Sequence, residues 1–228
     1  MDVFGEALKD EFINGGADIL WLHNSYDEPE QMPVDIFFRE EEEMSDLEYK
    51  ALEMCEGRVL DIGAGAGSHA LELQKKGFEV TALDNSPAAV SIMRQRGVKQ
   101  VVEDNLEHYR PEPFDTILLL MNGIGITGSL EGLREFLERA KNMIQPDGQL
   151  IFDSSDIAYL YQTIPKPLNK YYGEVSFQYE YKNQKGNWFN WLYIDEHTLT
   201  ALAKESGWNC EIVLDDGQDQ YLAQLTIA

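Results

Sequence analysis

The order of apolar and polar segments in this chain predicts an α/β fold built on a mostly parallel sheet. Between residues 57 and 153, short apolar runs alternate with segments whose apolar residues recur at helical spacing. A run of three alternating glycines separates the first apolar run from the first helical segment. Because crossovers between parallel strands are right-handed, we expect these strands to share one sheet, with their carboxyl ends at one edge.

Five apolar runs are predicted to be the parallel strands, and three helices are predicted between them. Ser86 as N-cap and Pro87 at the first helical position start one of these helices, and Ser129 caps another. A turn at residues 146–148 leads into the last of the five strands. The predicted strands cover residues 58–62, 78–83, 99–102, 114–121 and 149–152, and the predicted helices cover residues 68–76, 87–97 and 130–144.

Residues 154–194 depart from this α/β alternation. Aromatic and apolar residues alternate with polar ones at 175–181, and aromatic residues return at 187–194 after a polar turn. This pattern predicts an inserted antiparallel β-hairpin. Three roles are open for it: a cover packed over the sheet, a lid that supplies an aromatic substrate pocket, or a dimer interface.

The two ends of the chain complete the predicted architecture. Residues 1–56 carry apolar residues at helical spacing and predict a helical cap, interrupted by a loop-like stretch at 23–33. The acidic run at 40–43 is predicted to be a solvated helix start. A C-terminal helix and two further strands are predicted at residues 197–206, 210–214 and 220–227.

The composition narrows the range of partners and compartments. The 228 residues include 41 Asp and Glu against 18 Lys and Arg, a formal net charge of −23, which disfavours nucleic acid and anionic membranes as partners. Cys55 and Cys210 are isolated and have no metal-ligand pattern near them, so neither a metal site nor a disulfide framework is expected. With no signal-peptide pattern at the N-terminus, a cytoplasmic protein is predicted.

The glycine run is the most informative segment of the chain. Asp61 lies within the apolar run before it, and Gly63, Gly65 and Gly67 follow. A strand, a tight glycine turn and a helix N-terminus together allow a nucleotide-like ligand to approach the backbone closely.

Two further acids stand where neighbouring strands are predicted to end. Asp84 ends the second strand, nineteen positions after Gly65, which is near the distance at which a carboxylate reaches a nucleotide ribose. Asp104 ends the third strand, where a carboxylate can accept a hydrogen bond from an exocyclic amine such as that of adenine. We therefore expect a ligand site at the carboxyl edge of the sheet.

These segments resemble the class I, Rossmann-like S-adenosylmethionine-dependent methyltransferases. Residues 60–67 resemble the first motif of that family, Asp84 its ribose-binding acid, Asp104 its adenine contact, and residues 146–152 its turn and fifth strand. The resemblance implies a seven-stranded, mostly parallel sheet with an antiparallel last strand, and S-adenosylmethionine as cofactor with S-adenosylhomocysteine as product. Carried over position by position, the implied cofactor-binding residues are Asp61, Gly63, Ala64, Gly65, Asp84, Asn85, Asp104, Asn105, Met121 and Asn122.

The resemblance also implies how the chain is organised. It covers residues 57–153, which are expected to be the cofactor-binding core. Residues 1–228 are expected to form a single methyltransferase domain, with the cap at 1–56, the hairpin insertion at 154–194 and the end of the sheet at 195–228. The nearest rival is a dinucleotide-binding domain, whose fingerprint needs a glycine where Ser68 stands. Glycine follows Asn122, so the Asn-Pro-Pro motif of adenine or glutamine methylation is absent.

No catalytic residue is assigned from the sequence. Methyl transfer from a sulfonium is an in-line displacement, which positioning and desolvation can accelerate without a dedicated residue. Where the acceptor needs a general base, the candidates near the site are His23, Tyr26, Asn122, Asp153 and Asp156. His69 is predicted to lie on a helix face instead.

The predicted function is methyl transfer to a small-molecule acceptor. The alternatives are methylation of a protein or RNA, and binding of S-adenosylmethionine without catalysis. The acidic composition weighs against RNA. A homodimer is left open.

Overall fold

The computed structural model describes residues 1–162 and 165–228, which divide into two compact units. Unit 1 comprises Met1–Met44, Leu60–Tyr109 and Ser176–Phe189, and unit 2 comprises Ser45–Val59, Arg110–Val175 and Asn190–Ala228.

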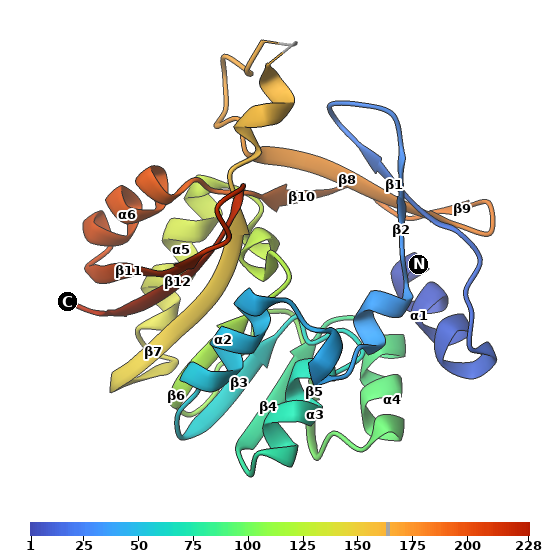
Figure 1. Ribbon diagram of the computed structural model, residues 1–228, viewed down its shortest axis with the longest axis horizontal. Coiled ribbons are helices and arrows are strands. Elements are labelled where there is room, and N and C mark those ends of the chain that lie inside the picture. Colours follow the sequence, from blue (N-terminus) through green and yellow to red (C-terminus); the bar gives the residue numbers. More distant parts are fainter. Residues whose placement is uncertain (163–164) are drawn as a thin grey trace. The chain divides into compact units, whose positions relative to one another are not determined.

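The main sheet has seven strands in the order β11-β12-β7-β6-β3-β4-β5 (Figure 1). The pairs β4–β5 and β6–β7 are parallel, whereas β12 is antiparallel to both β7 and β11. The strands are β3 (Arg58–Ile62), β4 (Glu79–Asp84), β5 (Gln100–Glu103), β6 (Phe114–Leu119), β7 (Ile144–Ser155), β11 (Trp208–Asp215) and β12 (Gln220–Ile227). The predicted seven-stranded sheet with its reversed last strand is confirmed.

One of these strands is longer than predicted. The turn expected at residues 146–148 lies inside β7. The pairing of β7 with β6 shifts register there, because Phe114 is opposite Ile144 whereas Thr116 is opposite Gln149. Pro146 and Gly148 therefore produce an irregularity within the strand instead of a separate turn.

The helices of unit 1 begin and end where local signals place them. Gly67 has a left-handed φ of 84° and leads into α3 (Ser68–Lys75). The Ser86 hydroxyl accepts from Ala89 N at 3.0 Å to cap α4 (Pro87–Arg96), which ends at left-handed Gly97. Asp2 caps α1 (Val3–Asn14) by accepting from Gly5 N at 2.8 Å.

The core of unit 1 packs α1 against α4. Gly5 makes the close approach possible, since a Cβ atom there would lie 2.7 Å from Cβ of Ala88. Half-buried aromatic side chains pack around this core, among them Phe4, Phe37 and Tyr179. Its buried members are Val3, Ala7, Leu8, Leu20, Val34, Ala66, Ala89, Ile92 and Tyr181.

A second sheet follows the order β10-β8-β1-β2, with β9 paired to β8. The predicted hairpin is present, and its turn has left-handed Lys182 and Asn183 with φ of 48° and 62°. The prediction of a loop at residues 23–33 is wrong in part, because strands at 20–24 and 30–32 pair with each other. The strands are β1 (Leu20–Asn24), β2 (Glu30–Met32), β8 (Glu174–Tyr181), β9 (Gln184–Lys185) and β10 (Phe189–Leu192).

The α-helices of unit 2 are also capped by side chains. Ser45 and Glu48 form a capping box at α2 (Asp46–Met54), and Ser129 caps α5 (Leu130–Ala140). Asp195 caps α6 (Glu196–Glu205) by accepting from Thr198 N at 2.9 Å. The predicted apolar stripe of α5 is buried: Leu133, Phe136, Leu137 and Ala140.

Short 3₁₀ turns join several of these elements. In unit 1 they are η1 (Asp35–Phe38) and η2 (Glu41–Glu43), and in unit 2 they are η3 (Gly123–Thr127) and η4 (Ile157–Tyr161). Most of the acidic run at 40–43 thus forms a 3₁₀ turn, with Glu40 as its N-cap. Two of its carboxylates pair with lysines at the C-terminal end of α3, Glu40 with Lys75 at 2.7 Å and Glu41 with Lys76 at 2.6 Å.

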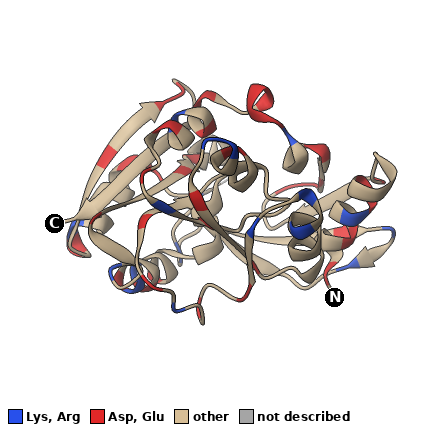
Figure 2. Cartoon of the chain, turned by 90° about the horizontal axis from the view of Figure 1, so that it is seen from below, with Lys and Arg blue, Asp and Glu red and all other residues tan. Residues whose placement is uncertain are grey.

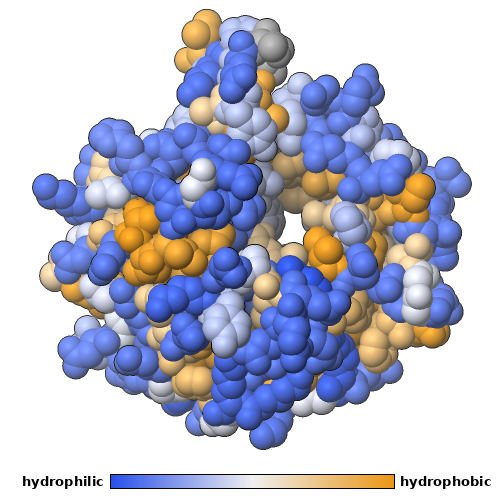
Figure 3. Space-filling model, in the orientation of Figure 1, coloured by the Kyte–Doolittle hydropathy of each residue, from blue (hydrophilic) through white to orange (hydrophobic). Residues whose placement is uncertain are grey.

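The chain is rich in acidic residues and hydrophilic overall. Acidic residues are spread over many elements (Figure 2). In the sequence, Asp and Glu outnumber Lys and Arg 41 to 18. Figure 3 shows a face that is mostly hydrophilic, with apolar atoms in separate patches. Within the described residues, no helix combines the length and the apolarity needed to cross a membrane.

Candidate active site

The glycine turn after β3 presents the exposed backbone of Gly63 at the carboxyl end of the strand, whereas Gly65 and Gly67 are buried. The backbone N–H groups of Gly63 and Ala64 both donate to the carbonyl oxygen of Leu83, at 2.9 and 3.1 Å, which fixes the turn against the end of β4. Gly63 and Gly65 have left-handed φ of 72° and 55°. A Cβ atom at Gly63 would meet nothing within 4 Å, so the space in front of this turn is open.

The Asp84 carboxylate joins the end of β4 to this turn. Its Oδ2 accepts from Gly65 N at 2.8 Å, and its Oδ1 accepts from Ser86 N at 2.8 Å. Burial raises the pKa of Asp84, and these backbone hydrogen bonds oppose that rise. Each carboxylate oxygen keeps a further lone pair, so the group can still accept hydrogen bonds from a ligand such as a ribose.

The second predicted acid lies beside the first. Asp104 N donates to the carbonyl oxygen of Asp84 at 3.2 Å, which places the ends of β4 and β5 together. The Asp104 carboxylate accepts from Asn105 N at 2.7 Å, and the Asn105 side chain accepts from Glu107 N at 3.1 Å. Asn85 and Asn105 are exposed. The structure therefore brings the glycine turn, Asp84 and Asp104 to one edge of the sheet.

Asp61 is a buried acid beneath the turn. Its side chain is 1% exposed, and its Oδ2 has no hydrogen-bond partner in the described part of the chain. Burial raises the pKa of Asp61 to about 6, nearby His69 opposes this shift, and Asp84 adds to it. A carboxylate in this position is suited to a cationic group of a ligand.

Two contacts at this site were not found from the sequence. His69 lies on α3 as expected, but it is buried, 7% exposed, and close enough to lower the pKa of Asp61. Asp2 accepts a hydrogen bond from Ser86 Oγ at 2.5 Å, and its charge contributes to the raised pKa of Asp84. Because Asp2 is far from Ser86 and Asp84 in the sequence, no local pattern predicts that it lies near them.

Met121 and Asn122 belong to unit 2 and follow β6 after one intervening residue, Leu120. Both have left-handed backbone, with φ of 62° and 55°, a conformation that costs about 1–3 kcal/mol for a residue other than glycine. Side chains of β7 hold this turn: Asp153 Oδ2 accepts from Asn122 N at 2.9 Å, and Ser155 Oγ donates to Asn122 Oδ1 at 2.8 Å. Strain supported in this way is typical of functional turns.

The hairpin contributes a close contact to the same turn of unit 2. A Cβ atom at Gly125 would lie 2.0 Å from Nε1 of Trp191, and one at Gly128 would lie 3.3 Å from Cβ of Asn190. These glycines therefore allow β10 to pack on η3.

The candidate bases from the N-terminal region are held by other side chains. His23 Nε2 lies 2.7 Å from Glu180 Oε2, and the Tyr26 hydroxyl donates to Glu30 at 3.1 Å. His23 is opposite Gln178 in the β1–β8 pair, so it lies on the sheet face opposite to Phe177 and Tyr179.

In unit 2, Asp156 belongs to a cluster of tyrosines and acids. The Tyr172 hydroxyl donates to Asp156 Oδ1 at 2.6 Å, and the Tyr171 hydroxyl donates to Asp195 Oδ2 at 2.5 Å. Burial and these carboxylates raise the pKa of both tyrosines well above the usual value. Neither hydroxyl is therefore suited to lose its proton at neutral pH.

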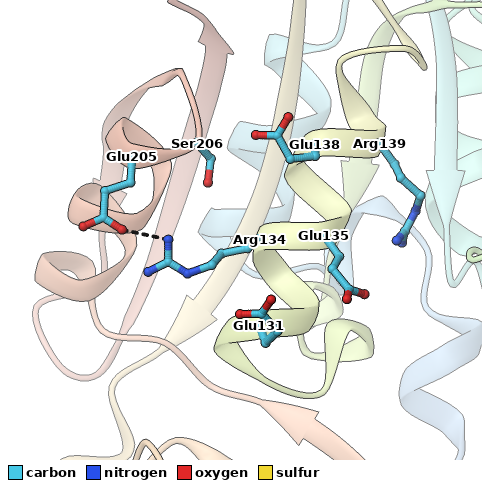
Figure 4. A pocket seen from close by; sticks show the side chains of 7 residues that line it. All are labelled: Glu131, Arg134, Glu135, Glu138, Arg139, Glu205 and Ser206. Atoms are coloured by element: carbon cyan, nitrogen blue, oxygen red, sulfur yellow. Dashed lines mark hydrogen bonds and ion pairs between the residues drawn. The ribbon is translucent and has the colours of Figure 1, made fainter.

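A surface groove of about 520 Å³ between α5 and α6 is a separate feature of unit 2 (Figure 4). Arg134 crosses it to Glu205 at 2.7 Å. None of the predicted site residues lines it, which sets it apart from the candidate site; its lining residues are Glu131, Arg134, Glu135, Glu138, Arg139, Glu205 and Ser206. In residues 1–162 and 165–228, no group of three or more His, Cys, Asp or Glu side chains is placed to hold a metal ion.

Comparison with known proteins identifies the family. A family model described as a methyltransferase domain matches residues 35–212. The chain belongs to this methyltransferase family. The membership in the class I S-adenosylmethionine-dependent methyltransferases that was predicted from the glycine turn and its acids is thereby confirmed.

The methyltransferase is similar to a solved structure over its whole length. It shares 42% identity and a TM-score of 0.93 with a methyltransferase from Bacteroides fragilis that was crystallised with S-adenosyl-L-homocysteine, over 100% of this chain and 95% of that one. The CcbJ methyltransferase from Streptomyces caelestis has a TM-score of 0.62 at 15% identity, over 80% and 93% of the chains, which shows a shared fold.

Two relatives with named activities are more distant. The glycine/sarcosine N-methyltransferase of Aphanothece halophytica is 24% identical over 187 residues, 72% of this chain and 71% of that protein. A ubiquinone biosynthesis O-methyltransferase of Xylella fastidiosa is 34% identical over 77 residues, which are 30% of this chain and 31% of that protein.

Proposed function

We propose that this methyltransferase transfers the methyl group of S-adenosylmethionine to a small-molecule acceptor. The observation that carries the proposal is the Asp84 carboxylate, which accepts from Gly65 N at 2.8 Å beside the open space at Gly63. The expected ligand has one part that packs against the backbone of the turn and another that donates hydrogen bonds to the carboxylate. S-adenosylmethionine has both, because its methionyl chain can lie against the turn and its ribose hydroxyls can donate to Asp84.

The described residues fit the parts of this cofactor. Asp84 would accept from the ribose hydroxyls, and Asp104 with Asn105 would meet the adenine edge. The glycine turn would lie against the methionyl chain. Asp61 Oδ2, buried and without a hydrogen-bond partner in the described part of the chain, would accept from the ammonium group of the cofactor. Asn85, Met121 and Asn122 remain proposed contacts.

The bound cofactor supplies an electrophilic methyl group on a sulfonium. The residues of the chain bind and orient it, and they exclude water from the reacting atoms. No side chain is assigned as a general base.

A small-molecule acceptor is favoured by the charge of the chain and by one relative. A net charge of −23 opposes binding to a phosphate backbone. The glycine/sarcosine N-methyltransferase that matches 72% of this chain acts, by its name, on small amines. A ribosomal RNA methyltransferase of Tolumonas auensis also matches, at 36% identity over 61 residues, and it keeps RNA as the second candidate.

We also propose that residues 1–228 act as one methyltransferase domain in the cytoplasm. The isolated Cys55 and Cys210 support a reducing compartment. Light scattering of the purified protein tests the open question of a homodimer.

Calorimetry with S-adenosylhomocysteine tests the cofactor site. The wild-type protein is expected to bind it, and Asp84→Ala should weaken binding about 100-fold, since a carboxylate that accepts two hydrogen bonds is lost. Asp147→Ala, an exposed acid of unit 2, is the matched control and should bind as the wild type does. Absence of binding by the wild type would refute the proposal.

The acceptor class is tested with radiolabelled S-adenosylmethionine. Transfer of label to small amines or hydroxyl compounds, and not to total RNA or protein, is expected. Label in RNA alone would establish the second candidate. Cofactor binding with no transfer to any of these acceptors would favour a binding protein without catalysis.

A further inference from the structure

The segment that contains η1 lies directly against the glycine turn of unit 1. Ser68 Oγ, at the start of α3, donates to the carbonyl oxygen of Phe37 at 2.9 Å. A Cβ atom at Gly65 would have one neighbour within 4 Å, the Cδ1 atom of Phe37 at 3.7 Å. The ring edge of Phe37 is thus the side chain that faces the middle glycine of the turn.

One arginine binds this segment, the turn and the helix start together. Arg96, the last residue of α4, donates from one guanidinium nitrogen to the carbonyl oxygen of Ala66 at 2.8 Å and to Ser68 Oγ at 3.2 Å. Its other terminal nitrogen donates to the carbonyl oxygen of Phe38 at 3.4 Å, and the guanidinium lies 5.2 Å from the Phe38 ring centre. The fork of donors of an arginine side chain can hold several acceptors in fixed relative positions.

On its other side, Phe37 is held by an aromatic contact. The rings of Phe37 and Phe4 are 5.0 Å apart in an edge-to-face arrangement, and Phe4 stacks on Tyr179 at 5.2 Å. All three side chains are half-buried on the rim of the unit 1 core. Phe37 therefore has a fixed position, with ring surface that the core does not cover.

We propose that Phe37 is a ligand-contacting wall of the site at the glycine turn, and that Arg96 is the positioning residue that holds this wall in place. The proposal rests on the proposed function, in which the turn carries the methionyl chain of the cofactor. An apolar ring beside the turn excludes water from that chain. Neither residue was singled out by the sequence, since Phe37 is 28 positions before Gly65 and Arg96 is 31 positions after it.

Its contact with the glycine turn distinguishes Phe37 from an ordinary core side chain. Phe12 is also half-buried on the same core, where it stacks with Phe38 at 6.3 Å, but the contact that the structure gives at Gly65 is made by Phe37. Phe12→Ala is therefore the matched control for Phe37→Ala. Both substitutions remove a large apolar side chain, and Phe37→Ala alone should weaken ligand binding.

Calorimetry with S-adenosylhomocysteine on the full chain tests both residues. We expect Phe37→Ala and Arg96→Ala each to raise the dissociation constant about ten-fold, since each removes fixed contacts around the ligand. Phe12→Ala and Arg94→Ala, an exposed arginine on the same helix, should leave it within about two-fold of the wild type. Arg96→Lys keeps the charge but not the fork, so it should fall between Arg96→Ala and the wild type.

Hydrogen exchange distinguishes a positioning role of Arg96 in ligand binding from a purely structural role. In the wild type, S-adenosylhomocysteine should slow the exchange of amides in residues 36–39. This protection should persist in Arg94→Ala and be lost in Arg96→Ala. If Arg96→Ala does not fold, Phe37→Leu, which keeps an apolar but smaller side chain, should still weaken binding about three-fold.

The outcomes separate this inference from the proposed function. Wild-type affinity in both Phe37→Ala and Arg96→Ala, together with loss of binding in Asp84→Ala, would overturn the inference and leave the proposed function standing. Equal loss of binding in Phe12→Ala and Phe37→Ala would also overturn it, because the effect would then follow from core packing. Failure of the wild type to bind S-adenosylhomocysteine would refute the proposed function itself.

Discussion

The turn after β3 and the turn after β6 both have left-handed backbone, but different types of residue adopt it. In the first turn glycines adopt it, at Gly63 and Gly65, and Asp84 holds the turn by one hydrogen bond to the backbone. In the second turn Met121 and Asn122 adopt it, and this conformation is less favourable for Met121 than for Asn122, because asparagine tolerates left-handed backbone.

The difference shows how each turn is stabilised. The first is favoured by its own residue types, because glycine enters the left-handed region without strain. The second depends on distant neighbours: Asp153 and Ser155 hold Asn122, and Trp191 packs on Gly125. We therefore expect changes in the first turn to act mainly on ligand binding, and changes in the second to act mainly on stability.

The largest expected effect is on ligand binding at the first turn. Gly63→Ala places a methyl group in the open space where the ligand is proposed to lie, and S-adenosylhomocysteine affinity measured by calorimetry should fall about 100-fold. Gly217→Ala is the matched control: Gly217 has φ of 75° and, like Gly63, nothing within 4 Å of its Cβ position. Both variants should lose about 1 kcal/mol of stability from left-handed strain. Equal affinity in the two variants would contradict the assignment of the first turn.

The second turn should respond to Gly125→Ala mainly through stability. The added methyl group would lie 2.0 Å from Nε1 of Trp191, so β10 must shift, and the free energy of unfolding should fall by about 1–3 kcal/mol in urea denaturation. Adding Trp191→Leu should restore part of the loss, since the smaller side chain leaves room. Additive losses in the double variant would show that the two residues do not contact one another.

The buried Asp61 gives the first turn a pH dependence. Its pKa of about 6 means that the carboxyl is largely protonated at pH 5 and ionised at pH 7. If the ionised form binds the ammonium group of S-adenosylhomocysteine, affinity should rise about ten-fold from pH 5 to pH 7. Calorimetry at both pH values measures this change, and Asp61→Asn should remove it. An affinity that falls over this range would contradict the role of Asp61.

In the free protein, the raised pKa of Asp61 makes folding stability fall as the pH rises, whereas ligand affinity is expected to rise. A carboxyl whose pKa is raised by folding is stabilised in its protonated form, so its contribution to stability falls as the pH rises from about 4 to about 6. The neighbouring His69 and Asp84 modify this contribution. Ligand binding and folding should therefore respond to pH in opposite directions at Asp61.

The smallest expected effect is at Ser155. Ser155→Ala removes the hydrogen bond from Ser155 Oγ to Asn122 Oδ1, which should lower the free energy of unfolding by about 1 kcal/mol. If Asn122 contacts the cofactor, S-adenosylhomocysteine affinity should also fall about three-fold. An unchanged affinity would remove Asn122 from the proposed cofactor contacts.

The sequence predicted the parts of the fold that local signals specify. Buried β-strands, Ser and Pro at helix starts and glycines in turns have local causes, which is why β3, α4 and the first turn match their predictions. The pairing of β1 with β8 joins Trp21 to Glu180, and β2 joins the sheet through β1; no local pattern marks that stretch. A loop was predicted there for that reason.

The candidate site shows the same limit. Asp84 and Asp104 were predicted because parallel strands bring their carboxyl ends to one edge, and the structure places them beside each other. Phe37, Arg96 and Asp2 were missed, since tertiary packing brings them to the turn. His69 was assigned to a helix face because its position on the helix does not reveal that Asp61 lies next to it.

A crystal structure with S-adenosylhomocysteine would show whether the ligand lies at the first turn. We expect ribose hydroxyls within hydrogen-bond distance of Asp84, the adenine edge beside Asp104, and the amino group of the ligand next to Asp61. A ligand bound elsewhere, such as in the groove between α5 and α6, would refute this site.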